Sequence, residues 1–170
     1  TQEHSSAASD VYKRQQFLDN NFSPKKLKLI ESKRTNIILC RYLWDIIDHI
    51  GKNINDDKKY FAKQGKLSED FKFFERNSKK LINSQNMLIG KVEIQPNVVM
   101  DATSGPIIID DNVTIKSNTH LEGPLYVGCG STISPLTYVK NSVIGPLCKI
   151  GGELNSVVVE GYTNKVHYGF

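Results

Sequence analysis

Residues 109–149 read IDDNVTIKSNTHLEGPLYVGCGSTISPLTYVKNSVIGPLCK, and this stretch holds the pattern that decides the fold. An aliphatic residue recurs at every sixth position, at Ile109, Ile115, Leu121, Val127, Ile133 and Val139. A second set follows four residues after each of these, at Val113, Thr119, Leu125, Ser131 and Thr137. An α-helix repeats about every 3.6 residues and a strand about every two, so neither explains the pattern. Hexapeptide repeats do, and they predict a mainly β fold: a parallel β-helix with three short strands and about eighteen residues per coil.

The alternative is a run of ordinary short strands in a β-sandwich. Six aliphatic residues in register arise by chance with odds of roughly one in a thousand in an ordinary composition. We therefore favour the β-helix, with its aliphatic positions turned inward.

The repeat extends beyond this stretch with two departures. It resumes after a one-residue slip at Ile144 and Ile150, and it begins upstream with Leu88, Ile94 and Met100. Nine residues instead of six separate Met100 from Ile109, so we expect residues 101–106 to project as a loop, where solenoids tend to carry function. Three glycines that each follow an aliphatic residue are predicted to occupy corners whose backbone disfavours a β-carbon: Gly90, Gly128 and Gly145.

Composition excludes several classes of function. The 170 residues carry a net charge of +4 that is scattered along the chain, which disfavours a nucleic-acid partner. The three cysteines show no metal or disulfide spacing, which is typical of a cytoplasmic protein. No apolar run is long enough for a membrane span.

The region before the repeats divides into three segments. Residues 1–15 resemble the translation of a sequencing-library adapter and are expected to be non-native. Residues 16–35 are interpreted as the tail of a missing N-terminal domain, and residues 36–82 as a helical linker. Within it, apolar spacing predicts a helix over 35–51, ended by Gly51, and a second over 55–64. Residues 83–170 are then a truncated β-helix domain, so we expect the chain to be a fragment of a longer protein.

Several motifs, in one order along residues 40–170, resemble a group of bacterial sugar nucleotidyltransferases. They are an alternative form of the bifunctional uridyltransferase and glucosamine-1-phosphate acetyltransferase. The motifs are Arg41-Tyr42-Leu43-Trp44-Asp45, Met100-Asp101-Ala102, Gly105-Pro106-Ile107, Leu121-Glu122-Gly123-Pro124, Ile144-Gly145, Gly152-Glu153 and Gly161-Tyr162-Thr163-Asn164-Lys165-Val166-His167. The resemblance implies a left-handed β-helix, a homotrimer and an N-terminal nucleotidyltransferase domain. It also implies that residues 41–45 belong to the helix joining the two domains.

The same resemblance implies a set of site residues. Acetyl transfer to an amino sugar needs a base, and His167 is the predicted catalytic base because an imidazole titrates near working pH. Lys165 is predicted to bind the sugar phosphate, and Asn164 and Tyr162 to bind substrate or a neighbouring chain. Tyr168 stands where the family has an aspartate, and Lys149 is the basic residue on the preceding coil.

We therefore expect a fragment of a sugar-nucleotide biosynthetic enzyme of the UDP-N-acetylglucosamine pathway. The parent enzyme would use acetyl-CoA, a sugar phosphate, a nucleoside triphosphate and Mg²⁺, whereas the fragment by itself is expected to be inactive. The alternatives are a non-catalytic trimerisation scaffold and an acyltransferase for another sugar. A zinc site is disfavoured because only His120 and His167 lie in the repeats, and no metal or other cofactor is expected on this part of the chain.

Overall fold

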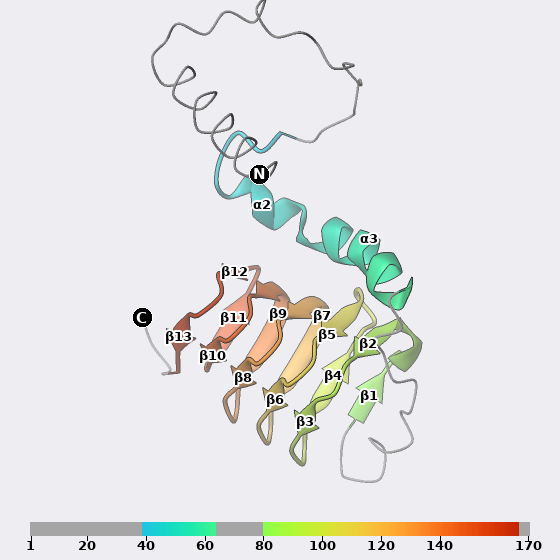
Figure 1. Ribbon diagram of the computed structural model, residues 1–170, viewed down its shortest axis with the longest axis vertical. Helices are drawn as coiled ribbons and strands as arrows, with labels where there is room; N and C mark the ends of the chain where they lie inside the picture. Colours follow the sequence, from blue (N-terminus) through green and yellow to red (C-terminus); the bar gives the residue numbers. More distant parts are fainter. Residues whose placement is uncertain (1–38, 64–79, 167–170) are drawn as a thin grey trace, which may run out of the picture. The chain divides into compact units, whose positions relative to one another are not determined.

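The computed structural model describes residues 39–63 and 80–166 (Figure 1). Residues 40–63 and 80–166 belong to one compact unit. Two helices come first, α2 (Asp45–Asp48) and α3 (Ile50–Lys63), and a 3₁₀ turn, η2 (Ser84–Asn86), follows the first strand. The strands are β1 (Lys80–Ile82), β2 (Met87–Ile89), β3 (Glu93–Ile94), β4 (Val99–Asp101), β5 (Ile107–Ile109), β6 (Thr114–Ile115), β7 (His120–Val127), β8 (Thr132–Ile133), β9 (Tyr138–Ile144), β10 (Lys149–Ile150), β11 (Glu153–Asn155), β12 (Val158–Val159) and β13 (Asn164–Lys165).

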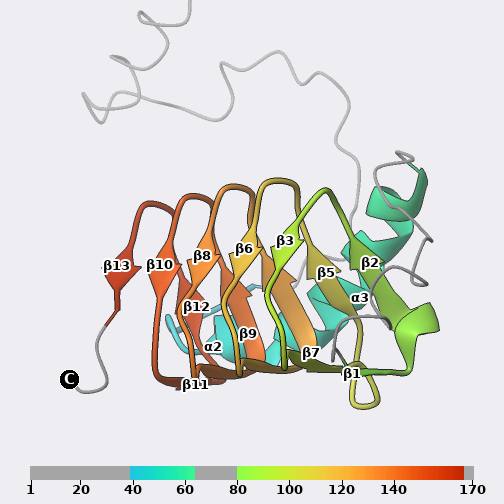
Figure 2. The same ribbon diagram turned by 90° about the horizontal axis from the view of Figure 1, so that it is seen from below.

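The strands stack in parallel along three faces of a solenoid, which confirms the predicted parallel β-helix (Figure 2). Face A consists of β1, β4, the first parts of β7 and β9, and β11. Face B consists of β2, β5, the later parts of β7 and β9, and β12. Face C consists of β3, β6, β8, β10 and β13. The chain thus passes repeatedly over three faces, of which A and B belong to one sheet joined through β7 and β9, and neighbouring coils are hydrogen-bonded to one another.

The interior of the solenoid is the ladder expected from the repeat. All six aliphatic positions from Ile109 to Val139 are fully buried, as are Ile144 and Ile150. The intermediate positions are buried as well. The hydroxyl groups of Thr119 and Ser131 bond to backbone carbonyls, whereas the buried Thr137 hydroxyl has no hydrogen-bond partner among the described residues. Ser131 Oγ donates to the Gly145 carbonyl at 2.9 Å and accepts from the Cys148 amide at 3.0 Å. Burial of this continuous apolar column is the main source of stability for the fold.

The coils shorten along the chain. On face C, Ile94 pairs with Ile115, Ile115 with Ile133, Ile133 with Ile150, and Ile150 with Lys165. Successive coils therefore take 21, 18, 17 and 15 residues. The longest contains the predicted 101–106 insertion, and the coil of 17 contains the predicted slip. The final shortening was not predicted.

Two expectations about the repeat are wrong in detail. Leu88 points out of the solenoid and packs under the helix, whereas Met87 and Ile89 on either side of it are buried in the core. Gly128 and Gly145 do not have left-handed backbone. They lie so close to the next coil that a β-carbon on Gly145 would stand 2.4 Å from the Gly161 nitrogen, and one on Gly128 would stand 2.6 Å from the Pro146 nitrogen.

The left-handed corner positions are held mainly by other residues. Asn97, Asn118 and Leu136 stack at one corner with φ angles of 61°, 59° and 57°. Asparagine tolerates this conformation better than most residues because its short side chain bonds locally. Asparagine therefore favours this turn in the first two coils, whereas Leu136 adopts the same conformation in the third without that advantage.

The helical region also differs from its prediction. Gly51 is the second residue of α3 and does not end a helix, and residues 41–44 form turns before the four-residue α2. Asp45 explains the interruption, because its carboxylate accepts the backbone N–H groups of Arg41 at 2.7 Å and Tyr42 at 3.0 Å. Such local side-chain bonds compete with helical ones. The predicted helix over 55–64 lies within α3, except Gln64, which is outside the described residues.

Helix α3 covers face B. Ile50 and Ile54 form a buried cluster with Ile108 of β5, and Phe61 stacks on Tyr126 of β7 with ring centroids 6.0 Å apart. Burial under the helix raises the pKa of Tyr126 to about 12. The outer surface of face B is thus an apolar surface that packs against α3. Polar side chains that could bind a ligand lie on faces A and C.

Candidate functional site

The predicted site residues fall on the last coil that the structure describes. His167 lies outside the described residues. Tyr162 occupies the corner after β12, where its φ of 64° is in the left-handed region and its side chain is 80% exposed. Asn164 and Lys165 form β13 on face C.

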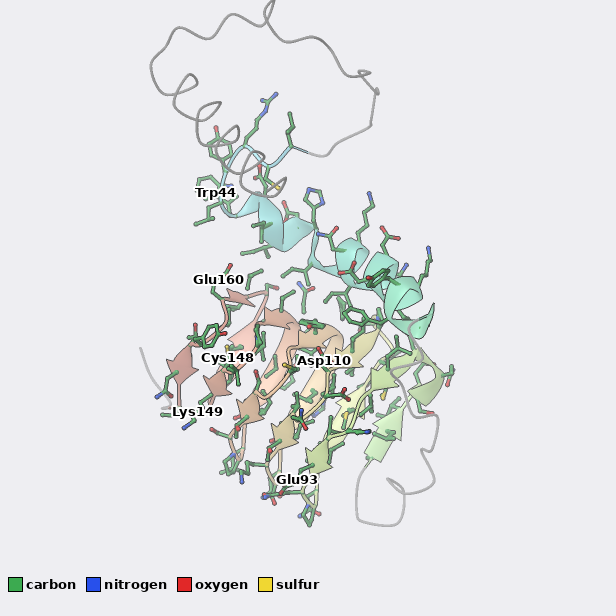
Figure 3. All side chains as sticks on the ribbon, in the orientation of Figure 1. Trp44, Glu93, Asp110, Cys148, Lys149 and Glu160 are labelled. Carbon is green, nitrogen blue, oxygen red and sulfur yellow. The ribbon has the colours of Figure 1, made fainter. Side chains whose placement is uncertain are left out.

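The structure brings Asn164 next to Lys149. The two residues pair in register on β13 and β10, and both side chains are exposed (Figure 3 labels Lys149). Neighbouring strands lie about 4.8 Å apart, so an amide and an ammonium group stand side by side on the outer surface of face C. Both are suited to hydrogen-bonding a phosphate or a hydroxyl group.

Lys165 is placed differently. It pairs with the inward-facing Ile150, and its Nζ donates to the Gly151 carbonyl at 2.9 Å. Successive residues of a strand point to opposite sides. Lys165 therefore does not stand in the outer row that Asn164 shares with Lys149.

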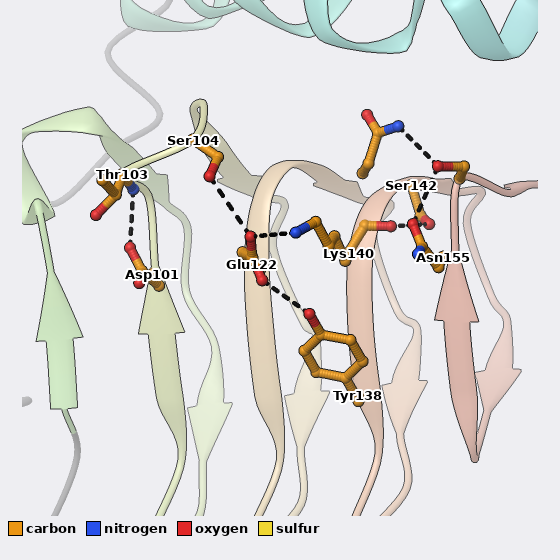
Figure 4. A network of polar contacts seen from close by, with 10 residues as sticks. Asp101, Thr103, Ser104, Glu122, Tyr138, Lys140, Ser142 and Asn155 are labelled. Carbon is orange, nitrogen blue, oxygen red and sulfur yellow. Dashed lines mark hydrogen bonds and ion pairs between the residues drawn. The ribbon is translucent and has the colours of Figure 1, made fainter.

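A second polar group lies on face A, and sequence reasoning did not identify it. Glu122 of β7 accepts hydrogen bonds from Tyr138 Oη at 2.8 Å and from Lys140 Nζ at 2.7 Å, both on β9 (Figure 4). Ser104 Oγ approaches the same carboxylate at 3.5 Å. The Glu122 side chain is only 18% exposed, because these neighbours surround it.

The solenoid register explains this grouping. Asp101, Glu122, Lys140 and Asn155 form one outward row across β4, β7, β9 and β11. Val99, His120, Tyr138 and Glu153 form the next row, and the His120 ring meets the Tyr138 ring edge-on with centroids 5.3 Å apart. His120 is the first residue of β7. A spacing of one coil, between positions 120 and 138 and between 122 and 140, was the available signal.

The charges of this group stabilise one another. The ammonium of Lys140 and the hydroxyl of Tyr138 hold the pKa of Glu122 below its ordinary value. Because Lys140 and Tyr138 donate these hydrogen bonds to the carboxylate, their own pKa values are raised. Bonds from the side chain and backbone of Thr103 lower the pKa of Asp101, with a smaller contribution from His120. Glu122 and Lys140 therefore keep their charges, and Tyr138 keeps its proton, over a broad range of pH.

The predicted 101–106 loop borders this group. Thr103 and Ser104 are exposed, whereas Ala102 and Pro106 at its ends are buried. The Thr103 amide donates to Asp101 Oδ1 at 2.9 Å, and Gly105 packs so tightly on Pro124 that a β-carbon would stand 2.9 Å from it. The extra residues of the long coil are thus anchored to face A at both Asp101 and Pro124.

Within residues 39–63 and 80–166, no three or more histidine, cysteine, aspartate or glutamate side chains are grouped to hold a metal ion. The helices of the same part of the chain are too short or too polar to cross a membrane. In comparisons with known proteins, no family model, no curated protein and no solved structure matches this chain.

Proposed function

We propose that this chain is the linker and β-helix part of a sugar-nucleotide biosynthetic enzyme, in which the β-helix contributes to acetyl transfer onto a sugar phosphate. The pairing of exposed Asn164 with exposed Lys149 on face C carries the proposal. Asn164 lies three residues before His167 in the sequence, within the 161–167 segment that resembles the acetyltransferase family, and Lys149 lies on the preceding coil.

The proposed chemistry assigns one role to each group. The amine of an amino sugar would attack the acetyl carbonyl of acetyl-CoA, forming a C–N bond as the C–S bond breaks. His167 would take the proton from the amine and return it to the leaving thiolate. Lys149 and Asn164 would hold the phosphate and hydroxyl groups of the sugar, so that the amine is oriented towards the base.

The backbone supports this role by fixing the coil. The Lys149 amide donates to the Thr163 carbonyl at 2.9 Å, and the Gly151 amide donates to the Lys165 carbonyl at 2.6 Å. Residues that orient a substrate are most effective on rigid elements. The position of the pair on a hydrogen-bonded sheet is therefore favourable for binding.

Nucleotidyl transfer would belong to a separate N-terminal domain of the parent enzyme. That reaction needs Mg²⁺ held by carboxylates, and the residues described here do not supply such a set. The left-handed sense of the solenoid, a homotrimeric state and a cytoplasmic location form part of the same proposal.

The test uses the full-length parent protein with acetyl-CoA and glucosamine 1-phosphate. We expect acetyl transfer in the wild type, a loss of about 100-fold or more in His167→Ala, as for removal of a general base, and a raised KM for the sugar in Lys149→Gln. His49→Ala, on the helical segment, is the matched histidine control and should keep wild-type activity. Unchanged transfer in His167→Ala would remove this residue as the base. Absence of transfer in every protein would overturn the acetyltransferase proposal and leave the scaffold alternative.

A further inference from the structure

The three outer faces of the solenoid carry different chemistry. The outer row of face B is apolar and packs under α3. The outer row of face C contains the Lys149–Asn164 pair already assigned a role. Face A presents ionisable side chains in both outward rows, and the proposed acetyl transfer makes no use of them.

The side chains of face A are already ordered by contacts within the protein. Glu122 holds the hydroxyl of Tyr138 and the ammonium of Lys140 in fixed positions, and the Tyr138 ring in turn contacts His120. Side chains that are held in place lose little conformational entropy when a ligand binds. This surface is thus organised in advance for binding.

The inserted loop of the long coil borders this surface, and a plain solvated sheet has no such border. The three-residue insertion of the long coil places Ser104 and Thr103 along one edge, and both hydroxyl-bearing residues contact carboxylates of the group. Insertions in solenoid repeats form loops on one face, and this is often the face that binds a ligand. The insertion and the two rows of ionisable residues arise from different parts of the sequence, and both lie at face A.

The spacing of the group matches a small ring-shaped ligand. His120, Glu122, Tyr138 and Lys140 occupy the corners of a rectangle of about 4.8 Å between coils and about 6.8 Å along the strand. The corners include hydrogen-bond donors and an acceptor, and the Tyr138 ring offers an apolar surface beside them. The hydroxyl groups and C–H faces of a single hexose are spread over the same scale.

The charge of the face decides between a phosphate and a hydroxyl-rich ligand. The acidic side chains in the two outward rows are Asp101, Glu122 and Glu153, and the basic ones are Lys80 and Lys140. With His120 neutral the face carries a charge of −1, which repels a multiply charged phosphate. Carboxylates accept hydroxyl hydrogens, and they attract the ammonium of an amino sugar.

We propose that the outer surface of face A, formed by Asp101, His120, Tyr138 and Lys140 around Glu122 and bordered by Ser104, binds a hexose through its hydroxyl groups, without requiring a phosphate. Asp101 accepts from the sugar and Lys140 donates to it. Tyr138 packs against the C–H face of the ring. This site lies on a different face from the Lys149–Asn164 pair, so it stands whether or not the chain takes part in acetyl transfer.

The test is a titration of the isotope-labelled 170-residue chain followed by nuclear magnetic resonance. The probes are glucosamine, N-acetylglucosamine and inorganic phosphate, each added separately. We expect each hexose to shift the signals of His120, Tyr138 and the 103–105 loop. For a given hexose, all these signals should report the same dissociation constant. Phosphate should leave them unchanged. Lys140→Gln should weaken hexose binding about tenfold, which is the effect of one lost hydrogen bond to a charged group. His120→Ala should also weaken it, because Tyr138 loses the ring that packs against it. Lys116→Gln, on face C, is the matched control and should bind as the wild type does.

Four results would overturn this inference. The first is the absence of any shift at face A with either hexose, in a chain whose spectrum shows the folded solenoid. The second is an equal shift with inorganic phosphate alone. The third is a change of the same signals with protein concentration in the absence of ligand, which would identify face A as a contact between copies of the chain. Retention of binding in both His120→Ala and Lys140→Gln would also exclude the assigned contacts.

Discussion

At the scale of single residues, Glu122 is the group whose ionisation matters most for the folded state. Its pKa is held below its ordinary value of 4.5, chiefly by Lys140, and the pKa of Lys140 is raised above 10.5 by the same contact. A carboxyl with a depressed pKa adds stability above its unfolded pKa, and this is lost as the pH falls through the folded value. A lysine with a raised pKa adds stability below its unfolded pKa, and this is lost as the pH rises through the folded value. The Glu122–Lys140 pair therefore stabilises the folded state at pH values between the folded-state pKa of Glu122 and that of Lys140.

The acid limit gives a direct prediction. Glu122→Gln should lower the melting temperature at pH 7, because the charged bonds to Lys140 and Tyr138 are lost. The difference from wild type should shrink as the pH falls from about 4.5 through the lower folded-state pKa of Glu122, because the wild-type carboxyl becomes protonated there. Thermal unfolding followed by circular dichroism between pH 7 and pH 3 measures both curves. Glu93→Gln, which removes a carboxyl from face C, is the control. A constant difference between wild type and Glu122→Gln at all pH values would contradict the prediction.

At the scale of elements, two glycines show how differently a helix and a coil corner treat a β-carbon. Gly51 lies inside α3, where a β-carbon would meet Pro124 at 3.4 Å, an ordinary contact. Gly145 lies at a coil corner, where a β-carbon would meet the backbone of Gly161 at 2.4 Å. The first site has room for a side chain, and the second is closed by the next coil.

This contrast predicts opposite effects for the same substitution. Gly51→Ala should raise the free energy of unfolding by about 0.5–1 kcal/mol, because alanine loses less conformational entropy in a helix. Gly145→Ala should lower it by about 1–3 kcal/mol, because the two coils must move apart. Urea denaturation of the two variants beside wild type is the measurement. Equal effects of the same sign would show that the corner is not closed by Gly161.

At the scale of the whole molecule, stability depends on the stacking of coils. Each inward aliphatic residue contacts the inward residues of the coils before and after it. In such a fold, loss of packing in one coil also weakens the neighbouring coils. Ile133 is fully buried between Ile115 and Ile150. Ile108 is just as well buried, but it lies outside the solenoid, under α3.

Substitution of these two isoleucines distinguishes the contribution of the solenoid core from that of the contact with α3. Ile133→Ala should cost about 2–5 kcal/mol, and hydrogen exchange should accelerate in both β6 and β10. Ile108→Ala should cost a similar amount, but exchange should accelerate mainly in α3. Amide exchange followed by mass spectrometry resolves the segments. Exchange that remains confined to β8 in Ile133→Ala would mean that the coils do not unfold together.

Neighbouring side chains on the outer surface could be predicted only where their separation in the sequence equals the regular coil length of eighteen residues. Glu122 and Lys140 are eighteen positions apart, as are His120 and Tyr138, so a coil of 18 residues places each pair side by side. Lys149 and Asn164 are fifteen apart, and they pair only because the coil shortens there. His167 stays a prediction, as do the acetyl transfer and the trimer.

By itself, the sequence determined the parallel β-helix, its inward rungs and its inserted loop, because burial of every sixth residue is a local requirement that each hexad must satisfy. Only the tertiary structure decided how long each coil is, which face α3 covers, and which outward side chains meet. Those outcomes depend on register between residues that are fifteen to twenty-one positions apart. Register follows from the packing of one coil on the next, and no single hexad contains that information.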